Sequence, residues 1–238
     1  MSIELRNVTV RTRNTLSPIT LSNLNLQIGA RDRFAFLGPP KSGVELVVSV
    51  ICGAMAPDEG RVIRTSSLSW PLPSAPFLHK HLTFVANARF VARIYEADER
   101  PFINRVLEMA DLQEMAEERV DHCPSSAVSR FTFALGACLP FDIYLVIKTK
   151  VGDKSDHEKF AGVLTDLGKR SGLILATSST KDVAEYCDSA LVLDPVGPVY
   201  YDDIEAATEH LQRIIKRREE TDEMEFPEDE SGGQFDDF

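Results

Sequence analysis

The sequence of 238 residues contains few cysteines and no long hydrophobic run. Its four cysteines, Cys52, Cys123, Cys138 and Cys187, have none of the Cys-x-x-Cys spacing of thiol metal and redox sites. Three of them lie among apolar neighbours, so we expect small buried side chains in a reducing compartment. No stretch approaches the roughly 20 apolar residues that cross a bilayer, and the N-terminus has no signal-peptide pattern. We therefore expect a soluble chain that could work at a membrane only by docking on a spanning protein.

The sequence also lacks an excess of basic residues. The net charge is −11, but ten of the 37 acidic residues lie between Glu219 and Phe238, a segment without Lys or Arg. The rest of the chain has 27 acidic and 26 basic residues. Nucleic-acid binding neutralises phosphates with surplus Lys and Arg, so we expect no nucleic-acid partner. Residues 219–238, which include Pro227 and two glycines, are predicted to form an acidic disordered tail.

Hydrophobic patterning predicts an α/β fold. The first thirty residues alternate as short strands do, and residues 33–37 form an apolar run typical of a buried strand. Residues 44–51 are rich in β-branched side chains, but their position after a glycine-bounded loop favours a buried helix. Helical spacing marks residues 82–118, and residues 203–218 predict an amphipathic helix. Later apolar runs, each preceded by a helical segment, predict parallel strands at 144–147, 173–176 and 190–193.

The loop at residues 38–43 has the glycine spacing of the P-loop, G-x-x-x-x-G-K-[ST]. In that motif, N–H groups at a helix N-terminus hold phosphate. Here the lysine position is Val44, which has no charge, and the Mg²⁺-binding hydroxyl position is Glu45, which would repel phosphate. Two prolines also remove N–H donors. Lys41 is a possible substitute cation, and the alternative is that both glycines only shape a turn. The candidate nucleotide-binding residues are Gly38, Lys41, Ser42, Gly43, Val44 and Glu45.

Motifs around this loop, weak one by one, occur in an order and spacing that resemble a known family. They are Leu68-Ser69-Trp70-Pro71, Leu82-Thr83 with Asn87, the run Phe90 to Tyr95, Phe141-Asp142-x-Tyr144, Val151-Gly152-Asp153 and Tyr186-Cys187-Asp188. Over residues 3–205 the sequence resembles the ATP-binding subunits of capsular polysaccharide exporters, a branch of the ABC transporters. The resemblance implies an α/β P-loop NTPase fold, an ABC-type nucleotide-binding domain over residues 1–218. It also implies an N-terminal antiparallel β subdomain and a helical subdomain at about 77–128.

The same resemblance places the functional positions of the family on residues of other types. The strand-end aspartate and catalytic glutamate fall on Ile147 and Lys148, the switch histidine on Ser178, the γ-phosphate-sensing glutamine on His79, the signature stretch on Pro124-Ser125-Ser126-Ala127, and the adenine-stacking aromatic near Thr12. Phosphoryl transfer is catalysed almost entirely by electrostatic positioning. We therefore expect a degenerate, pseudo-ATPase-like subunit with no catalytic residue and no cofactor, binding ATP and Mg²⁺ only if nucleotide binding is retained.

Other patterns in the sequence give weaker indications of function. His79-x-His81, with His122 elsewhere, has no carboxylate or cysteine at zinc-site spacing, so a surface pair is expected. The serine pairs at 125–126 and 178–179 lack the G-x-S-x-G elbow of a nucleophile. We expect no metal site. The phenylalanines of the acidic tail fit either a short interaction motif or an inert solubilising tail.

The resemblance implies partners and a location. Its members work on the cytoplasmic face of the cell membrane, docked on a permease, and we expect helix 82–95 to make that contact. We also expect a homodimer, or a heterodimer with a competent ATPase subunit. Two alternatives stay open. One is a regulatory or scaffold protein that reuses the fold through partner contacts. The other is an atypical active ATPase that drives polysaccharide export with Glu45 and Lys41.

Overall fold

The computed structural model describes residues 1–12 and 19–225. The N-terminal part forms a three-stranded antiparallel sheet in the order β2-β1-β4. Its strands are β1 (Ser2–Arg11), β2 (Thr20–Gly29) and β4 (Glu59–Arg64). Alternate apolar side chains such as Ile3 and Leu5 are buried on one face. These contacts confirm the predicted antiparallel β subdomain.

The second sheet has five strands in the order β5-β6-β3-β7-β8. The first four are parallel, and β8 pairs antiparallel with β7. The three later apolar runs do form parallel strands, as predicted, whereas β8 was not predicted. Its first two residues, Gly197 and Pro198, gave no strand pattern. The strands are β3 (Arg33–Leu37), β5 (Ile143–Val146), β6 (Gly172–Thr177), β7 (Ser189–Asp194) and β8 (Gly197–Tyr201).

Helices cover both faces of this sheet. On one face, Phe34 and Phe36 of β3 pack in a core with α1 and the antiparallel sheet. On the other, Ala35 and Leu37 pack in a second core with the remaining helices. Burial on both faces explains why these strands read as continuous apolar runs. The helices around the sheet are α1 (Val44–Ile51), α5 (His157–Arg170), α6 (Thr180–Tyr186) and α7 (Ile204–Glu225).

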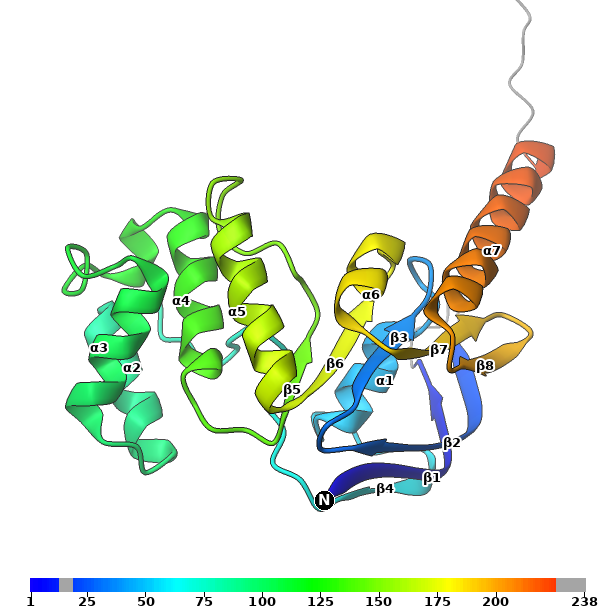
Figure 1. The fold of residues 1–238 in the computed structure, drawn as a ribbon, viewed down its shortest axis with the longest axis horizontal. Helices are drawn as coiled ribbons and strands as arrows, with labels where there is room; N and C mark the ends of the chain where they lie inside the picture. The colour runs from blue at the N-terminus through cyan, green and yellow to red at the C-terminus, as the bar shows by residue number, and fades with distance from the viewer. Residues whose placement is uncertain (13–18, 226–238) are drawn as a thin grey trace, which may run out of the picture.

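A group of helices stands beside the sheet, on the left of Figure 1. The predicted helical subdomain ends at about residue 128, but that point falls inside α4. No break interrupts α4 there, because Phe131, Phe133 and Leu135 continue the buried face. The elements are α2 (Phe84–Ile94), α3 (Glu99–Ala110), the short 3₁₀ helix η1 (Val120–His122) and α4 (Ser125–Ala137).

The last helix is longer than its sequence pattern predicts. The prediction ended it at Arg218 and assigned residues 219–238 to a disordered tail, which is wrong for residues 219–225. This stretch consists mostly of good helix formers, and Lys216 lies 3.9 Å from Glu220 one turn later, which supports continuation. Residues 226–238 lie outside the described part. Among the described helices, none combines the length and apolar character that crossing a membrane requires.

Candidate functional site

Three parallel strands, β5, β6 and β3, end side by side at one edge of the sheet, at the top of Figure 1. The loop 38–43 follows β3, Ile147 follows β5, and Ser178 follows β6. A cavity of about 540 Å³ lies here, and its lining includes residues 38–40 of the loop, the start of α1, Ile147 and Ser178. The structure therefore brings three of the six candidate nucleotide-binding residues, Gly38, Val44 and Glu45, together with two of the three positions assigned to catalytic groups.

The loop has a backbone suited to starting a helix. Gly43 adopts a φ of 99°, and its carbonyl oxygen accepts hydrogen bonds from two N–H groups in the first turn of α1. A β-carbon on Gly38 would lie 2.3 Å from Oγ of Ser42, so that position requires glycine while Ser42 keeps its place. The Ser42 N–H donates to the Pro39 carbonyl oxygen at 3.0 Å, so this N–H is bonded within the loop itself.

Val44 and Glu45 occupy the positions that decide phosphate and metal binding. The Val44 side chain is 8% exposed and packs into the core between the two sheets, so it brings no charge to the cavity. Glu45 is exposed in the first turn of α1, where the helix dipole stabilises a carboxylate. A carboxylate at this point opposes the attraction that the N–H groups of the same turn exert on a phosphate.

Ile147 and Ser178 complete the cavity wall. The Ile147 N–H donates to the Leu72 carbonyl oxygen at 2.9 Å, and its side chain is 41% exposed. Lys148 is exposed and lies outside the residues that line this cavity. Within the described ranges no cation lines it, and Glu45 is its one carboxylate. The groups that would bind Mg²⁺ and a triphosphate are therefore missing from this donor set, and the residues do not fit that cofactor.

The remaining predicted positions lie apart from the cavity lining. His79 is exposed in the loop before α2, and Pro124 stands at the N-terminus of α4 without a side-chain cap. Thr12 donates its N–H to the Ile19 carbonyl oxygen at 2.9 Å, next to residues 13–18, which lie outside the described part. The structure thus leaves the signature, sensing and adenine positions outside the lining of this cavity.

Lys41 points to a different hollow from the one that holds Ile147. It is exposed, adopts a φ of 64°, and lines a second cavity of about 540 Å³ on the other flank of the loop. Asp194 and Arg218 share that lining. The predicted substitute cation therefore lines a different cavity from the one that Val44, Glu45 and Ile147 line.

Sequence reasoning missed two contacts, one at the start of α2 and one at the loop 38–43. Asn87, 3% exposed, accepts the His79 N–H at 2.9 Å and donates to the His79 carbonyl oxygen at 3.1 Å, which fixes the loop before α2. The sequence signal for this contact was Asn87 itself, a polar residue within the apolar stripe of helix 82–95. Arg218 of α7 donates to the Pro40 carbonyl oxygen at 3.0 Å, across 178 residues of sequence, for which no local pattern exists.

The predicted surface histidines lie near one carboxylate. His81 Nδ1 is 2.8 Å from Asp121 Oδ2, and His122 Nε2 is 3.8 Å from Asp121 Oδ1. A hydrogen bond from Arg119, together with His81, lowers the pKa of Asp121 to about 2 although partial burial opposes it. Across residues 1–12 and 19–225, no three His, Cys, Asp or Glu side chains come together as a metal site.

No family model matches the chain. It is 30% identical over 201 residues to the polysialic acid transport ATP-binding protein KpsT of Escherichia coli, covering 82% of this chain and 91% of that protein. It is 29% identical to the capsule polysaccharide export ATP-binding protein CtrD of Neisseria meningitidis serogroup B, with 82% and 90% covered. It is 28% identical to the ATP-binding protein BexA of Haemophilus influenzae, with 82% and 91% covered.

Solved structures give the same fold. An ATP-binding subunit of an ABC transporter superposes with a TM-score of 0.74 at 16% identity, covering 93% of this chain and 99% of that one. A dimeric ATP-binding cassette with ADP and Pi superposes with a TM-score of 0.68 at 20% identity, covering 80% and 93%. The predicted fold class, an ABC-type nucleotide-binding domain with an antiparallel β subdomain and a mixed sheet, is confirmed.

Proposed function

Because the chain belongs to the family of ABC-transporter ATP-binding subunits that serve capsular polysaccharide export, we propose that it is a nucleotide-binding-domain subunit of such an export system that does not itself hydrolyse ATP. In this proposal it docks on membrane permease subunits at the cytoplasmic face of the membrane. It pairs there with a second nucleotide-binding domain, either its own copy or a competent ATPase.

One observation supports the absence of hydrolysis: Val44 and Ile147 stand in the same cavity, where phosphoryl transfer needs a cation and a metal-binding carboxylate. Stabilisation of the departing phosphate depends on such charges, because little else accelerates this reaction. Ser178, at the position of the switch histidine, also lines the cavity. Its side chain is a hydroxyl, which does not titrate near neutral pH. Among the described residues, no side chain that lines this cavity carries a positive charge to neutralise the developing charge.

A second candidate function is an active ATPase with rearranged groups. The names of the relatives favour it over our main proposal, because each of them is described as an ATP-binding protein. It requires Glu45 to bind Mg²⁺ and Lys41 to reach the γ-phosphate. Lys41 lines the other cavity, so this candidate also requires the loop to rearrange when nucleotide binds.

Isothermal titration calorimetry with ATP and Mg²⁺, followed by phosphate release, separates the two candidates. Our proposal expects no turnover, with or without weak binding. Micromolar binding with turnover that Lys41→Ala and Glu45→Gln abolish would establish the active ATPase instead. Lys154→Ala is the matched control for Lys41→Ala, because both lysines are exposed and Lys154 lies outside either cavity.

The docking surface in this proposal is the outer face of α2 with the loop before it. Large apolar side chains are exposed here although α2 buries its other face: Phe77 39%, Leu82 43%, Phe90 50%, Ile94 63% and Tyr95 44%. Aromatic and aliphatic side chains grouped in this way mark protein interfaces more often than isolated ones do. The face is therefore suited to a helix or loop of a membrane subunit.

Co-purification with the permease tests this contact. Phe90→Ser with Ile94→Ser removes two apolar side chains without touching the core of α2, so the variant should fold and lose the permease. Val196→Ser is the matched control, because Val196 is 91% exposed on the β7–β8 turn. Retention of the permease by the double variant would rule this surface out.

A further inference from the structure

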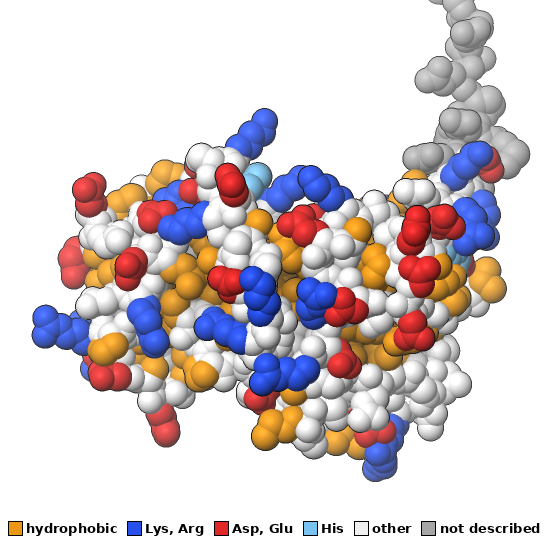
Figure 2. All heavy atoms as spheres, viewed as in Figure 1, with side chains coloured by type: hydrophobic (Ala, Val, Ile, Leu, Met, Phe, Trp, Pro, Cys, Tyr) orange, Lys and Arg blue, Asp and Glu red, His pale blue; other side chains and the backbone are white. Residues whose placement is uncertain are grey.

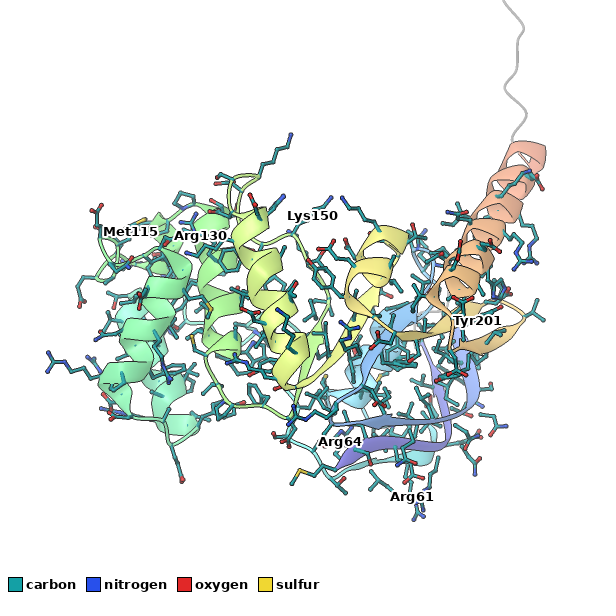
Figure 3. The ribbon with its side chains drawn as sticks, in the orientation of Figure 1. Arg61, Arg64, Met115, Arg130, Lys150 and Tyr201 are labelled. Atoms are coloured by element: carbon teal, nitrogen blue, oxygen red, sulfur yellow. The ribbon has the colours of Figure 1, made fainter. Side chains whose placement is uncertain are left out.

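A hollow at the junction of α7 with β8 gathers positive charge. It has a volume of about 530 Å³, and its lining consists of Tyr201, His210, Arg213, Lys216, Arg217 and Glu220. Figure 2 shows Lys and Arg side chains gathered along α7, and Figure 3 labels Tyr201 at the foot of that helix. The hollow shares no lining residue with either cavity at the loop 38–43, so it is a separate candidate site.

The helical spacing of the cations brings them to one face of α7. Arg213 precedes Lys216 by three positions and Arg217 by four, and side chains at these spacings have β-carbons about 5–6 Å apart. Elsewhere on the helix, Leu211 and Ile214 are buried, which fixes the rotation of α7 about its axis. The cations therefore stay together beside β8, where they can converge on one anionic group.

A buried hydrogen-bond network fixes the base of the hollow. His210 Nε2 lies 2.8 Å from Asp194 Oδ2, and His210 Nδ1 lies 3.0 Å from the Tyr201 hydroxyl oxygen. The side chains of His210 and Asp194 are only 12% and 7% exposed, so the imidazole ring is held in one orientation. The Asp194 carboxylate also accepts the Val196 N–H and lies 3.6 Å from Arg217. Asp194 is outside the lining, and its charge already has partners.

The carboxylates around the hollow do not balance its cations. Within the described lining, Glu220 is the one carboxylate, and its Oε1 lies 3.9 Å from Lys216 Nζ. These two side chains are 56% and 77% exposed, and such a pair contributes little. Arg213 forms no ion pair with any described side chain, and Glu209, one turn earlier, is exposed and outside the lining. Like charges one turn apart disfavour a helix, so an anion in the hollow would relieve their repulsion.

The number of cations indicates the kind of anion. A phosphomonoester carries about two negative charges near neutral pH and presents three acceptor oxygens. Guanidinium groups bind such oxygens in pairs, whereas a carboxylate offers one charge and two oxygens to the same donors. We propose that this hollow binds a phosphomonoester, with its phosphate between Arg213, Lys216 and Arg217 and its organic part beside Tyr201. Soluble metabolites and the lipid phosphatidic acid both carry this group.

An NMR titration of the isotope-labelled full-length chain with glycerol phosphate, the soluble counterpart of the phosphatidic acid head, tests the proposal. The backbone N–H signals of Tyr201 and of residues 210–217 should shift and saturate. Glycerol, which lacks the phosphate, should shift none of them. Saturable shifts confined to the loop 38–43 and the start of α1 would place the phosphate at the P-loop and overturn the proposal.

A double variant tests which cations hold the phosphate. Arg213→Gln with Lys216→Gln should weaken binding about tenfold, because the loss of one exposed ion pair changes affinity by roughly threefold. Both side chains are exposed, so the variant should fold. Arg61→Gln with Lys154→Gln is the matched control, with the same charge change at two exposed positions outside the hollow. Figure 3 shows Arg61 on β4, away from Tyr201. Equal weakening by the two double variants would refute the site.

Sedimentation with phosphatidylcholine vesicles distinguishes the two sources of the phosphate. Binding that requires phosphatidic acid in the vesicles, and that the double variant in α7 loses, identifies a lipid ligand. Saturable binding of glycerol phosphate without vesicle binding identifies a soluble ligand. Phosphatidylglycerol, a phosphodiester, is the lipid control for charge. Without shifts from glycerol phosphate, either no vesicle binding or equal binding to vesicles of the two anionic lipids at equal surface charge overturns the proposal.

Discussion

Removing the carboxylate of Asp156 should destabilise the fold more than removing the partner of an exposed ion pair does. Its Oδ2 accepts from Arg130 Nη1 and from the Asp153 N–H, both at 2.9 Å, and the paired side chains are only 17% and 14% exposed. Arg130 also donates to the carbonyl oxygen of Ala110, the last residue of α3, at 2.9 Å. The pair therefore joins the end of α3 and the middle of α4 to the start of α5.

The expected cost follows from this geometry. Breaking a fully buried pair costs about 3–5 kcal/mol, because it leaves a charge without its partner. Asp156→Ala should cost less, about 2 kcal/mol, because Arg130 keeps the Ala110 contact and some solvent. Burial by itself raises the pKa of Asp156, but the Asp153 N–H and Arg130 outweigh it, so the net pKa is lowered. The folded state thus favours the charged carboxylate.

Urea unfolding of the wild type and of single variants measures the cost. Asp166→Ala is the matched control, because its pair with Lys169 is 74% and 69% exposed, and it should change the free energy of unfolding by less than about 0.5 kcal/mol. A double-mutant cycle with Arg130→Met isolates the coupling. If Asp156→Ala and Asp166→Ala have equal effects, the reasoning from burial is refuted.

Three further predictions concern stability. Gly60→Ala should cost at least about 2 kcal/mol in thermal unfolding, because the glycine has a φ of 76° and a β-carbon would lie 2.3 Å from two carbonyl oxygens of β1; a neutral effect would contradict this. Burial raises the pKa of Asp194, but the Val196 N–H and His210 lower it below 3.8 overall, so stability present above pH 3.8 should be lost as the pH falls through the folded pKa. Asp194→Asn should flatten that acid dependence. Phe84→Ala should cost about 3–5 kcal/mol in urea unfolding, because the ring is fully buried.

The sequence predicted the elements that obey a local pattern. Residues 44–51 became α1 despite their β-branched side chains, because Gly43 can adopt the left-handed conformation that begins the helix there. Strand β8 was missed because Gly197 and Pro198 depress its strand propensity, although pairing with β7 forms it. Tertiary pairing therefore overrode propensity in β8, whereas the local conformation of Gly43 decided α1.

The placement of the candidate residues follows from the order of the strands. Parallel strands that end at the same edge of the sheet bring residues 38–40 of the loop, Ile147 and Ser178 to one cavity, while the roles assigned to these positions stay predictions. The position of Lys41 depends on its φ of 64°, and the contact of Arg218 with Pro40 depends on how α7 packs against the sheet. Neither has a signal in neighbouring residues, so only the three-dimensional structure reveals them.

Magnesium-dependent phosphate release by the purified full-length chain tests the central claim most directly. The account predicts release from ATP no faster than in buffer alone, and no change when Glu45 is replaced by Gln, because no cation lines the cavity of Val44 and Ile147 and Ile147 stands where the family has its metal-binding carboxylate. Magnesium-dependent release above that background, abolished by Glu45→Gln and unaffected by the exposed-site control Glu59→Gln, would contradict it.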